Sequence, residues 1–127
     1  MHKKEKMRTV YTYSRKQAIE DGILGDVSVT AREAGIKYPT AITSAVHDML
    51  ADIPKRLQGV SSYNGRLWDL LWMLRCKIMR TQDDDQLNYF MILPTGASRK
   101  KNAEFKAVVN GGDNGEPVIT IMLPSES

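Results

Sequence analysis

The densest run of apolar residues lies between residues 65 and 80, and it predicts the central helix of the fold. On a helical wheel at about 100° per residue, the leucines form one edge and the two tryptophans, with Cys76 and Met79, form the other. Apolar residues cover well over half of the circumference, which indicates a helix packed on several sides. Arg75 falls near the middle of this apolar arc. We therefore expect a buried helix over 65–80 that carries one unusually placed cation.

Helical signals dominate the chain before this stretch. Capping-box patterns at Ser14 and Thr30 predict two short helices that end at Gly22 and Gly35. A third helix is expected over 40–53, because apolar residues recur there at helical spacing and a proline follows. The first half of the chain is therefore predicted to be helical.

Strand signals dominate the chain after it. Alternating and β-branched residues predict strands over 87–93, 104–109 and 117–123, and residues 110–115 form a strong turn signal between the last two. The predicted fold class is α+β, with a helical N-terminal half, one central buried helix (65–80) and a C-terminal three-stranded antiparallel meander.

Composition agrees with one globular domain. The chain has 127 residues, of which 42% are hydrophobic and 26% are charged. Residues 1–8 are expected to be a disordered basic lead, and 9–127 a single domain that opens with a short strand over 9–13. The net charge of +3 permits an anionic partner without requiring one. A single cysteine, and no apolar segment at the start or of membrane-spanning length, predict a cytoplasmic location and no membrane partner.

Catalytic and metal-binding signatures are weak. His47 has no second ligand or base at a useful spacing, and the chain contains neither a nucleophile motif nor a phosphate-binding glycine loop. The acidic run over 83–85 is typical of a solvated turn, because carboxylates that bind metals usually converge from separate elements. We therefore expect a non-enzymatic protein without a metal or a cofactor.

Arg75 is the most informative single residue, because an unpaired guanidinium among apolar side chains is costly. One interpretation is an internal ion pair with an acidic residue of the N-terminal half; the candidates are Glu20, Asp21, Asp26 and Glu33. The other is a ligand site, since an arginine stacked on Trp72 can bind a planar base or a phosphate. The candidate residues of this anion- or base-binding site are Arg75, Trp72, Arg66, Arg15 and Tyr13.

A different function is suggested by residues 27–50. This segment contains Ala-Arg-Glu-Ala-Gly-Ile and resembles the helix-turn-helix of bacterial repressors similar to the lactose repressor. The expected recognition helix has no lysine or arginine after its start, and it carries Asp48 and Asp52. As an alternative, the protein would be a DNA-binding regulator, and its candidate DNA contacts are Lys37, Tyr38, Thr40, Thr43 and Ser44.

Four stretches together, over 13–22, 31–35, 65–69 and 115–124, resemble an uncharacterised family of small proteins of bacteriophages, plasmids and other mobile elements. The resemblance implies a setting, the cytoplasm of a bacterial host cell, rather than a chemistry. It favours a small binding protein that acts in counter-defence, either by sequestering a nucleotide-like signal or by covering a host defence protein. A structural accessory protein is a third possibility. Seven methionines and exposed strand edges also permit a homo-oligomer.

Overall fold

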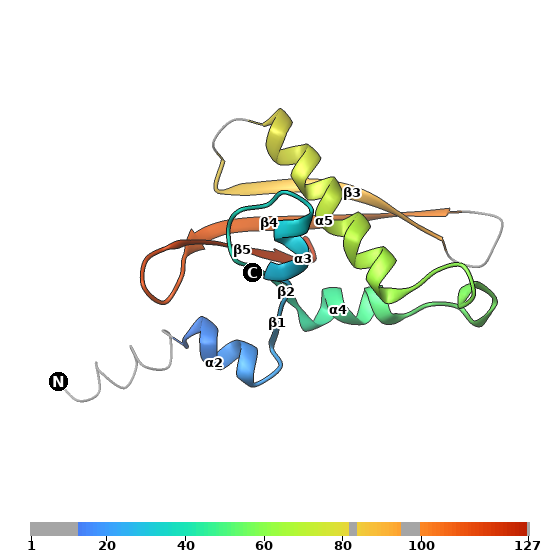
Figure 1. Ribbon diagram of the computed structural model, residues 1–127, viewed down its shortest axis with the longest axis horizontal. Helices are drawn as coiled ribbons and strands as arrows, with labels where there is room; N and C mark the ends of the chain where they lie inside the picture. Colours follow the sequence, from blue (N-terminus) through green and yellow to red (C-terminus); the bar gives the residue numbers. More distant parts are fainter. Residues whose placement is uncertain (1–12, 82–83, 95–99, 127) are drawn as a thin grey trace.

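The computed structural model describes residues 13–81, 84–94 and 100–126, which form one mixed sheet with helices packed on it (Figure 1). The helices are α2 (Arg15–Glu20), α3 (Ser28–Glu33), α4 (Ser44–Ala51), the short 3-10 helix η1 (Lys55–Leu57) and α5 (Tyr63–Arg80). The strands are β1 (Leu24–Asp26), β2 (Thr40–Thr43), β3 (Gln86–Pro94), β4 (Lys100–Gly111) and β5 (Pro117–Met122).

The sheet has five strands in the order β1-β2-β5-β4-β3, so the predicted three-stranded antiparallel meander is wrong. Strands β3, β4 and β5 do pair antiparallel, but β5 also pairs in parallel with β2, with Thr40 opposite Ile119. The two added strands contain only three and four residues. Such short segments are too brief to show the alternation that identifies a strand in a sequence.

The predicted helical N-terminal half is also wrong, because its helices are few, short and separated by strands. The helix expected over 40–53 is divided: Thr40–Thr43 is strand β2, and α4 begins only at Ser44. Thr43 is the residue at which the change occurs, since its side chain accepts a hydrogen bond from the backbone N–H of Val46 and caps α4.

The two shorter helix predictions agree better with the structure. Ser14 caps α2 by accepting the N–H of Gln17, and Gly22 ends that segment with a positive φ of 78°. Helix α3 spans Ser28–Glu33 with Val27 as its N-cap, so the cap predicted at Thr30 is three residues too late and Thr30 lies inside the helix. The basic lead expected over 1–8 lies outside the described residues, as does the strand expected over 9–13 except for residue 13.

Helix α5 spans Tyr63–Arg80 and lies across one face of the sheet (Figure 1). Its buried side consists of Leu67, Leu70, Leu71 and Leu74, together with Arg66. The opposite side, which includes both tryptophans, is exposed. Helix α5 packs on β3, α3 and α4, but the expectation that its whole apolar circumference would be packed is wrong, because no second layer of the described chain covers its tryptophan side.

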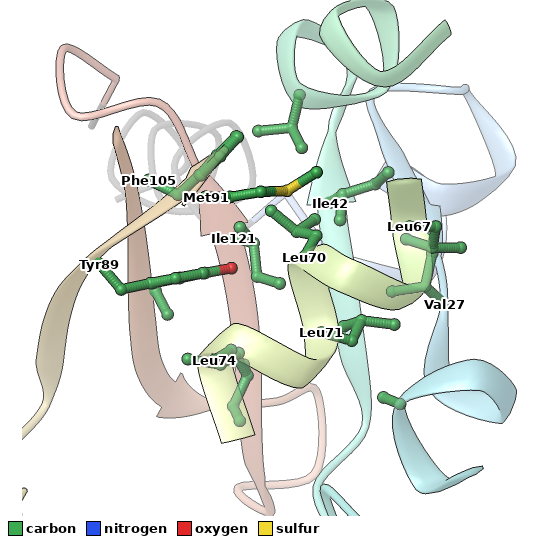
Figure 2. Packing of buried hydrophobic residues seen from close by; sticks show 14 of the residues in the cluster. Val27, Ile42, Leu67, Leu70, Leu71, Leu74, Tyr89, Met91, Phe105 and Ile121 are labelled. Atoms are coloured by element: carbon green, nitrogen blue, oxygen red, sulfur yellow. The ribbon is translucent and has the colours of Figure 1, made fainter. Parts of the chain in front are cut away.

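The core fills the space between α5 and the sheet. Figure 2 shows Leu70 and Leu74 of α5 close to Tyr89 of β3 and Ile121 of β5. Phe105 of β4 completes this layer, with its ring centroid 5.8 Å from that of Tyr89. Side chains alternate along the strands, so the residues between these core positions face the other side of the sheet.

Candidate functional site

Arg75 lies at a cleft of about 450 Å³ beside the C-terminal half of α5. The cleft is bounded by the connection between α3 and β2, by α5, by residues 84–85 and by the sheet. Its floor is apolar and deeply buried, and consists of Ile36, Leu87 and Ile119. The fold thus combines an apolar surface with a guanidinium at one concave place.

Charges of both signs surround this floor. Lys37 and Arg75 supply two cations, and Asp84 and Asp85 supply two carboxylates. Tyr38 adds an exposed aromatic side chain to the rim. The two cations can therefore bind an anionic group of a ligand. The two carboxylates can accept hydrogen bonds from N–H or O–H groups of the same ligand, because an ionised carboxylate has no proton to donate.

Two contacts hold the Arg75 side chain in place. Its guanidinium carbon lies 4.8 Å from the centroid of the Trp72 ring, which is a cation–π arrangement. Its stem crosses Gly35 so closely that a Cβ there would be 2.7 Å from Nε. The missing side chain of Gly35 therefore leaves room for Arg75 to reach the cleft. The φ of Gly35 is 99°, a backbone conformation that residues with a side chain rarely adopt.

The predicted internal ion pair of Arg75 does not form with any of its four proposed acidic partners, all of which the structure describes. Asp21 instead accepts hydrogen bonds from the side chains of Tyr13 and Gln17, and Asp26 accepts them from Ser28. This leaves the ligand-site interpretation of Arg75 as a hypothesis that the geometry allows.

Trp72 supports Arg75 from outside the cleft. It lies between Arg75 and Trp68 along the helix, and its ring stacks on that of Trp68 with centroids 6.1 Å apart and planes at 15°. Trp72 does not line the cleft itself. Of the predicted pair, only Arg75 is positioned to contact a ligand there, and Trp72 positions it.

Among the arginines that the structure describes, Arg66 is the one that is buried, with only 4% of its surface exposed. It donates hydrogen bonds to Ser61 Oγ (3.2 Å), to the Asp52 carbonyl (3.2 Å) and to the Pro94 carbonyl (2.8 Å). These contacts join α5 to the preceding loop and to the end of β3. Arg66 is therefore a structural residue away from the cleft, and its position on the polar side of the wheel concealed this.

Arg15 and Tyr13 belong to a different hollow, on the face of the sheet opposite α5. Arg15 donates to Thr120 Oγ1 and to the Ile119 carbonyl, both at 2.7 Å, and burial lowers its pKa. Tyr13 donates to the Asp21 carboxylate, and this hydrogen bond raises the pKa of Tyr13. The structure does not bring these two residues to Arg75.

The five candidate DNA contacts do not share one surface. Lys37 and Tyr38 are exposed at the cleft, whereas Thr40 is fully buried within β2 and donates to the Tyr38 carbonyl. Thr43 is half-buried and caps α4, and Ser44 is exposed at the start of that helix. Residues 27–50, all of them described, form a helix, a strand and a helix, so the expected recognition helix starting near Thr40 is wrong.

Asp84 and Asp85 are site residues that the pattern of the sequence did not reveal. They belong to the acidic run interpreted as a solvated turn, of which Asp83 lies outside the described residues. The chain returns from α5 to β3 at this point and places both carboxylates at the cleft. Their position at the cleft follows from the fold, which brings them and the α3–β2 connection to the same hollow, and no local pattern encodes that.

Within 13–81, 84–94 and 100–126, no group of three or more His, Cys, Asp and Glu side chains is arranged to hold a metal ion. No helix in those ranges combines the length and the apolar character needed to cross a bilayer.

Comparison with known proteins supplies a family and no activity. Residues 4–127 match the family described as "Family of unknown function (DUF6573)". No curated protein and no solved structure matches the chain significantly. The match spans nearly the whole sequence, and the chain therefore belongs to the DUF6573 family.

Proposed function

We propose that this chain is a non-enzymatic binding protein that captures a small nucleotide-like ligand in the Arg75 cleft. The observation that carries the proposal is a guanidinium held at the mouth of an apolar cleft by Trp72 and Gly35. The volume of about 450 Å³ lies within the usual range for small-molecule sites, roughly 300–1,000 Å³.

The chemistry of the cleft favours a ligand with three distinct parts. An anionic group would pair with Arg75 and Lys37, and a flat ring would lie on the apolar floor beside Tyr38. An edge that carries N–H groups, as a purine does, would donate to Asp84 or Asp85. The same carboxylates would repel a highly charged polyphosphate, so we expect a nucleotide with few phosphates.

The biological setting of the proposal is counter-defence by a phage or another mobile element. In the bacterial cytoplasm, a protein that binds a nucleotide signal stoichiometrically would lower its free concentration without consuming it. In the same setting, the chain could instead bind a host defence protein and cover its surface. The DNA-binding alternative has less support, because β2 occupies the place of the recognition helix.

Thermal unfolding with and without ligand tests the proposal. We would titrate GMP, AMP and their cyclic dinucleotides and follow the melting temperature. At about 100 times the dissociation constant, a bound ligand adds about 2.7 kcal/mol to the free energy of unfolding. The ligand that raises the melting temperature should fail to do so with Arg75→Ala.

Arg32→Ala is the matched control, because Arg32 is exposed on α3 and does not line the cleft. This variant should keep the full ligand response. The proposal is overturned if none of these nucleotides shifts the melting temperature at millimolar concentration, or if Arg75→Ala binds as tightly as the native chain.

A further inference from the structure

The outer face of α5 carries an apolar stripe that the described chain leaves open. The stripe consists of Trp68, Trp72, Cys76 and Met79, which fall within an arc of about 80° on a wheel of 100° per residue. Trp68, Trp72 and Met79 expose 39%, 41% and 70% of their surface. The leucines of α5 already fill the core on the other side, and within the described chain the stripe packs only in part, through the stack of Trp68, Trp72 and Arg75. A helix that is apolar on both sides is suited to a partner.

We propose that this stripe binds a second copy of the chain, with the two α5 helices packed antiparallel about a twofold axis that crosses the stripe at the level of position 74 along the helix. An antiparallel pair of identical helices brings together residues that are equally distant from the axis along the sequence. The stripe has this symmetry, because the pairs Trp68/Met79 and Trp72/Cys76 are centred within one residue of position 74. Each tryptophan of one copy would therefore meet a sulfur-containing side chain of the other, which is a favourable contact.

The charges on one flank of the stripe have the same symmetry, whereas Arg75 on the other flank lines the cleft. Asp69 and Arg80 lie about 20° apart on the wheel, on one flank of the stripe, and their midpoint also falls beside position 74. Both side chains are exposed, and Arg80 Nε donates to the Cys76 carbonyl at 3.3 Å, which holds its stem along the helix. In the antiparallel pair, Asp69 of each copy would face Arg80 of the other. Charge complementarity thus selects a second copy in this orientation.

The composition of the stripe is that of an interface centre. Tryptophan, methionine and arginine are enriched in such centres, and tryptophan is prominent among the residues that carry most of the binding energy. Helix α5 has 18 residues and is therefore about 27 Å long at 1.5 Å per residue. One helix pair of this length makes a modest interface, and we expect dissociation in the micromolar range. The pairing needs no nucleotide in the cleft, although Met79 also lines that cleft and Trp72 stacks on Arg75.

Reciprocal charge exchange tests the pairing in the full-length chain. Sedimentation at low salt and about 100 µM protein should show twice the chain mass of 14.3 kDa for the native sequence. Asp69→Arg and Arg80→Asp should each weaken the dimer at least tenfold, because each places like charges opposite one another. The double exchange should restore the native dissociation constant. Glu104→Lys reverses a charge on an exposed β4 position and should leave the dimer unchanged.

Circular dichroism spectra of the charge variants should coincide with that of the native chain, since Asp69, Arg80 and Glu104 are all exposed. Trp72→Glu should give a monomer, because it places a charge in the middle of the stripe. This variant tests the apolar contact separately from the ion pairs. The proposal is overturned if the native chain is a monomer at every concentration, if the single exchanges leave the dimer intact, or if the double exchange fails to restore it.

Discussion

At the scale of single residues, two arginines of α5 have opposite environments. Arg66 satisfies two backbone carbonyls and a serine hydroxyl inside the protein, so its charge is hydrogen-bonded although it is buried. Arg75 is half-buried and stacks on Trp72, with its guanidinium at the cleft. Removing Arg66 would leave buried acceptors without donors, whereas removing Arg75 would mainly change the cleft.

Gly35 connects backbone geometry to the position of Arg75, and a comparison with Gly22 isolates that effect. Both glycines have positive φ, but a Cβ at Gly22 meets nothing within 4 Å, whereas one at Gly35 meets Arg75. Gly22→Ala should therefore lower the free energy of unfolding by about 1 kcal/mol through backbone strain alone. Gly35→Ala should cost more, because the Arg75 side chain must also move.

Urea unfolding of both variants measures these costs, and tryptophan emission reports on the stack of Arg75 on Trp72. Gly35→Ala should shift the emission spectrum, and Gly22→Ala should leave it unchanged. Equal stability losses with an unchanged spectrum in both variants would contradict the assigned role of Gly35.

At the scale of elements, α2 depends on contacts from the distant end of the chain. The helix has six residues, too few to be stable alone. Asp113, in the turn between β4 and β5, accepts the backbone N–H groups of Arg15 at 2.8 Å and Lys16 at 3.0 Å. Arg15 in turn donates to β5. The carboxylate of Asp113 thus satisfies helix donors that no residue of α2 satisfies.

The attachment of α2 should weaken at acidic pH. The hydrogen bonds from the backbone N–H of Arg15 and then of Lys16 lower the pKa of Asp113 below its ordinary value. A carboxyl group whose pKa is lower in the folded state stabilises that state above its unfolded pKa of about 3.9. This contribution is lost as the pH falls through the folded value.

Melting temperatures of the native chain and of Asp113→Asn, measured between pH 7 and pH 2, check this dependence. The native chain should melt higher above about pH 5, and the difference should shrink below about pH 4. Asp48→Asn is the control, because its exposed side chain makes no hydrogen bond within the described part of the chain. A difference between native and Asp113→Asn that is independent of pH would show that this carboxylate does not hold α2.

At the scale of the whole molecule, β5 joins the two halves of the chain. It pairs with β2 from the first half and with β4 from the second, and its residues Val118–Ile121 are all buried. The leucines of α5 also need this sheet to cover them. The molecule should therefore unfold as one cooperative unit rather than as separate halves.

Two isoleucines in the sheet test that expectation. Ile121 of β5 is fully buried, whereas Ile92 of β3 exposes 56% of its surface on the other face. Ile121→Ala should lower the free energy of unfolding by about 2–5 kcal/mol, and Ile92→Ala should change it by no more than about 0.5 kcal/mol. Both variants should still unfold in a single transition by near- and far-ultraviolet circular dichroism. A second transition in Ile121→Ala would show that the halves fold independently.

The sequence alone determined the features that depend on near neighbours. These are the capped start of α2 at Ser14, the extent of α5 and the alternating strand β3. Each arises from interactions within about four residues or from a repeat of two or 3.6 positions, and both kinds of signal are written locally. Helix 65–80 and strand 87–93 were predicted close to their observed bounds for this reason.

Tertiary structure decided what depends on distant partners. Strand β2 forms because β5 supplies hydrogen bonds to it, and the paired residues Thr40 and Ile119 are 79 positions apart in the sequence. Without that partner, the four residues of β2 resemble the start of a helix. Which arginine is buried, and which side of α5 stays open, likewise follow from where the loops and the sheet happen to lie. The sequence shows whether a residue is apolar or charged, but only the packing of the whole chain decides which groups that residue contacts.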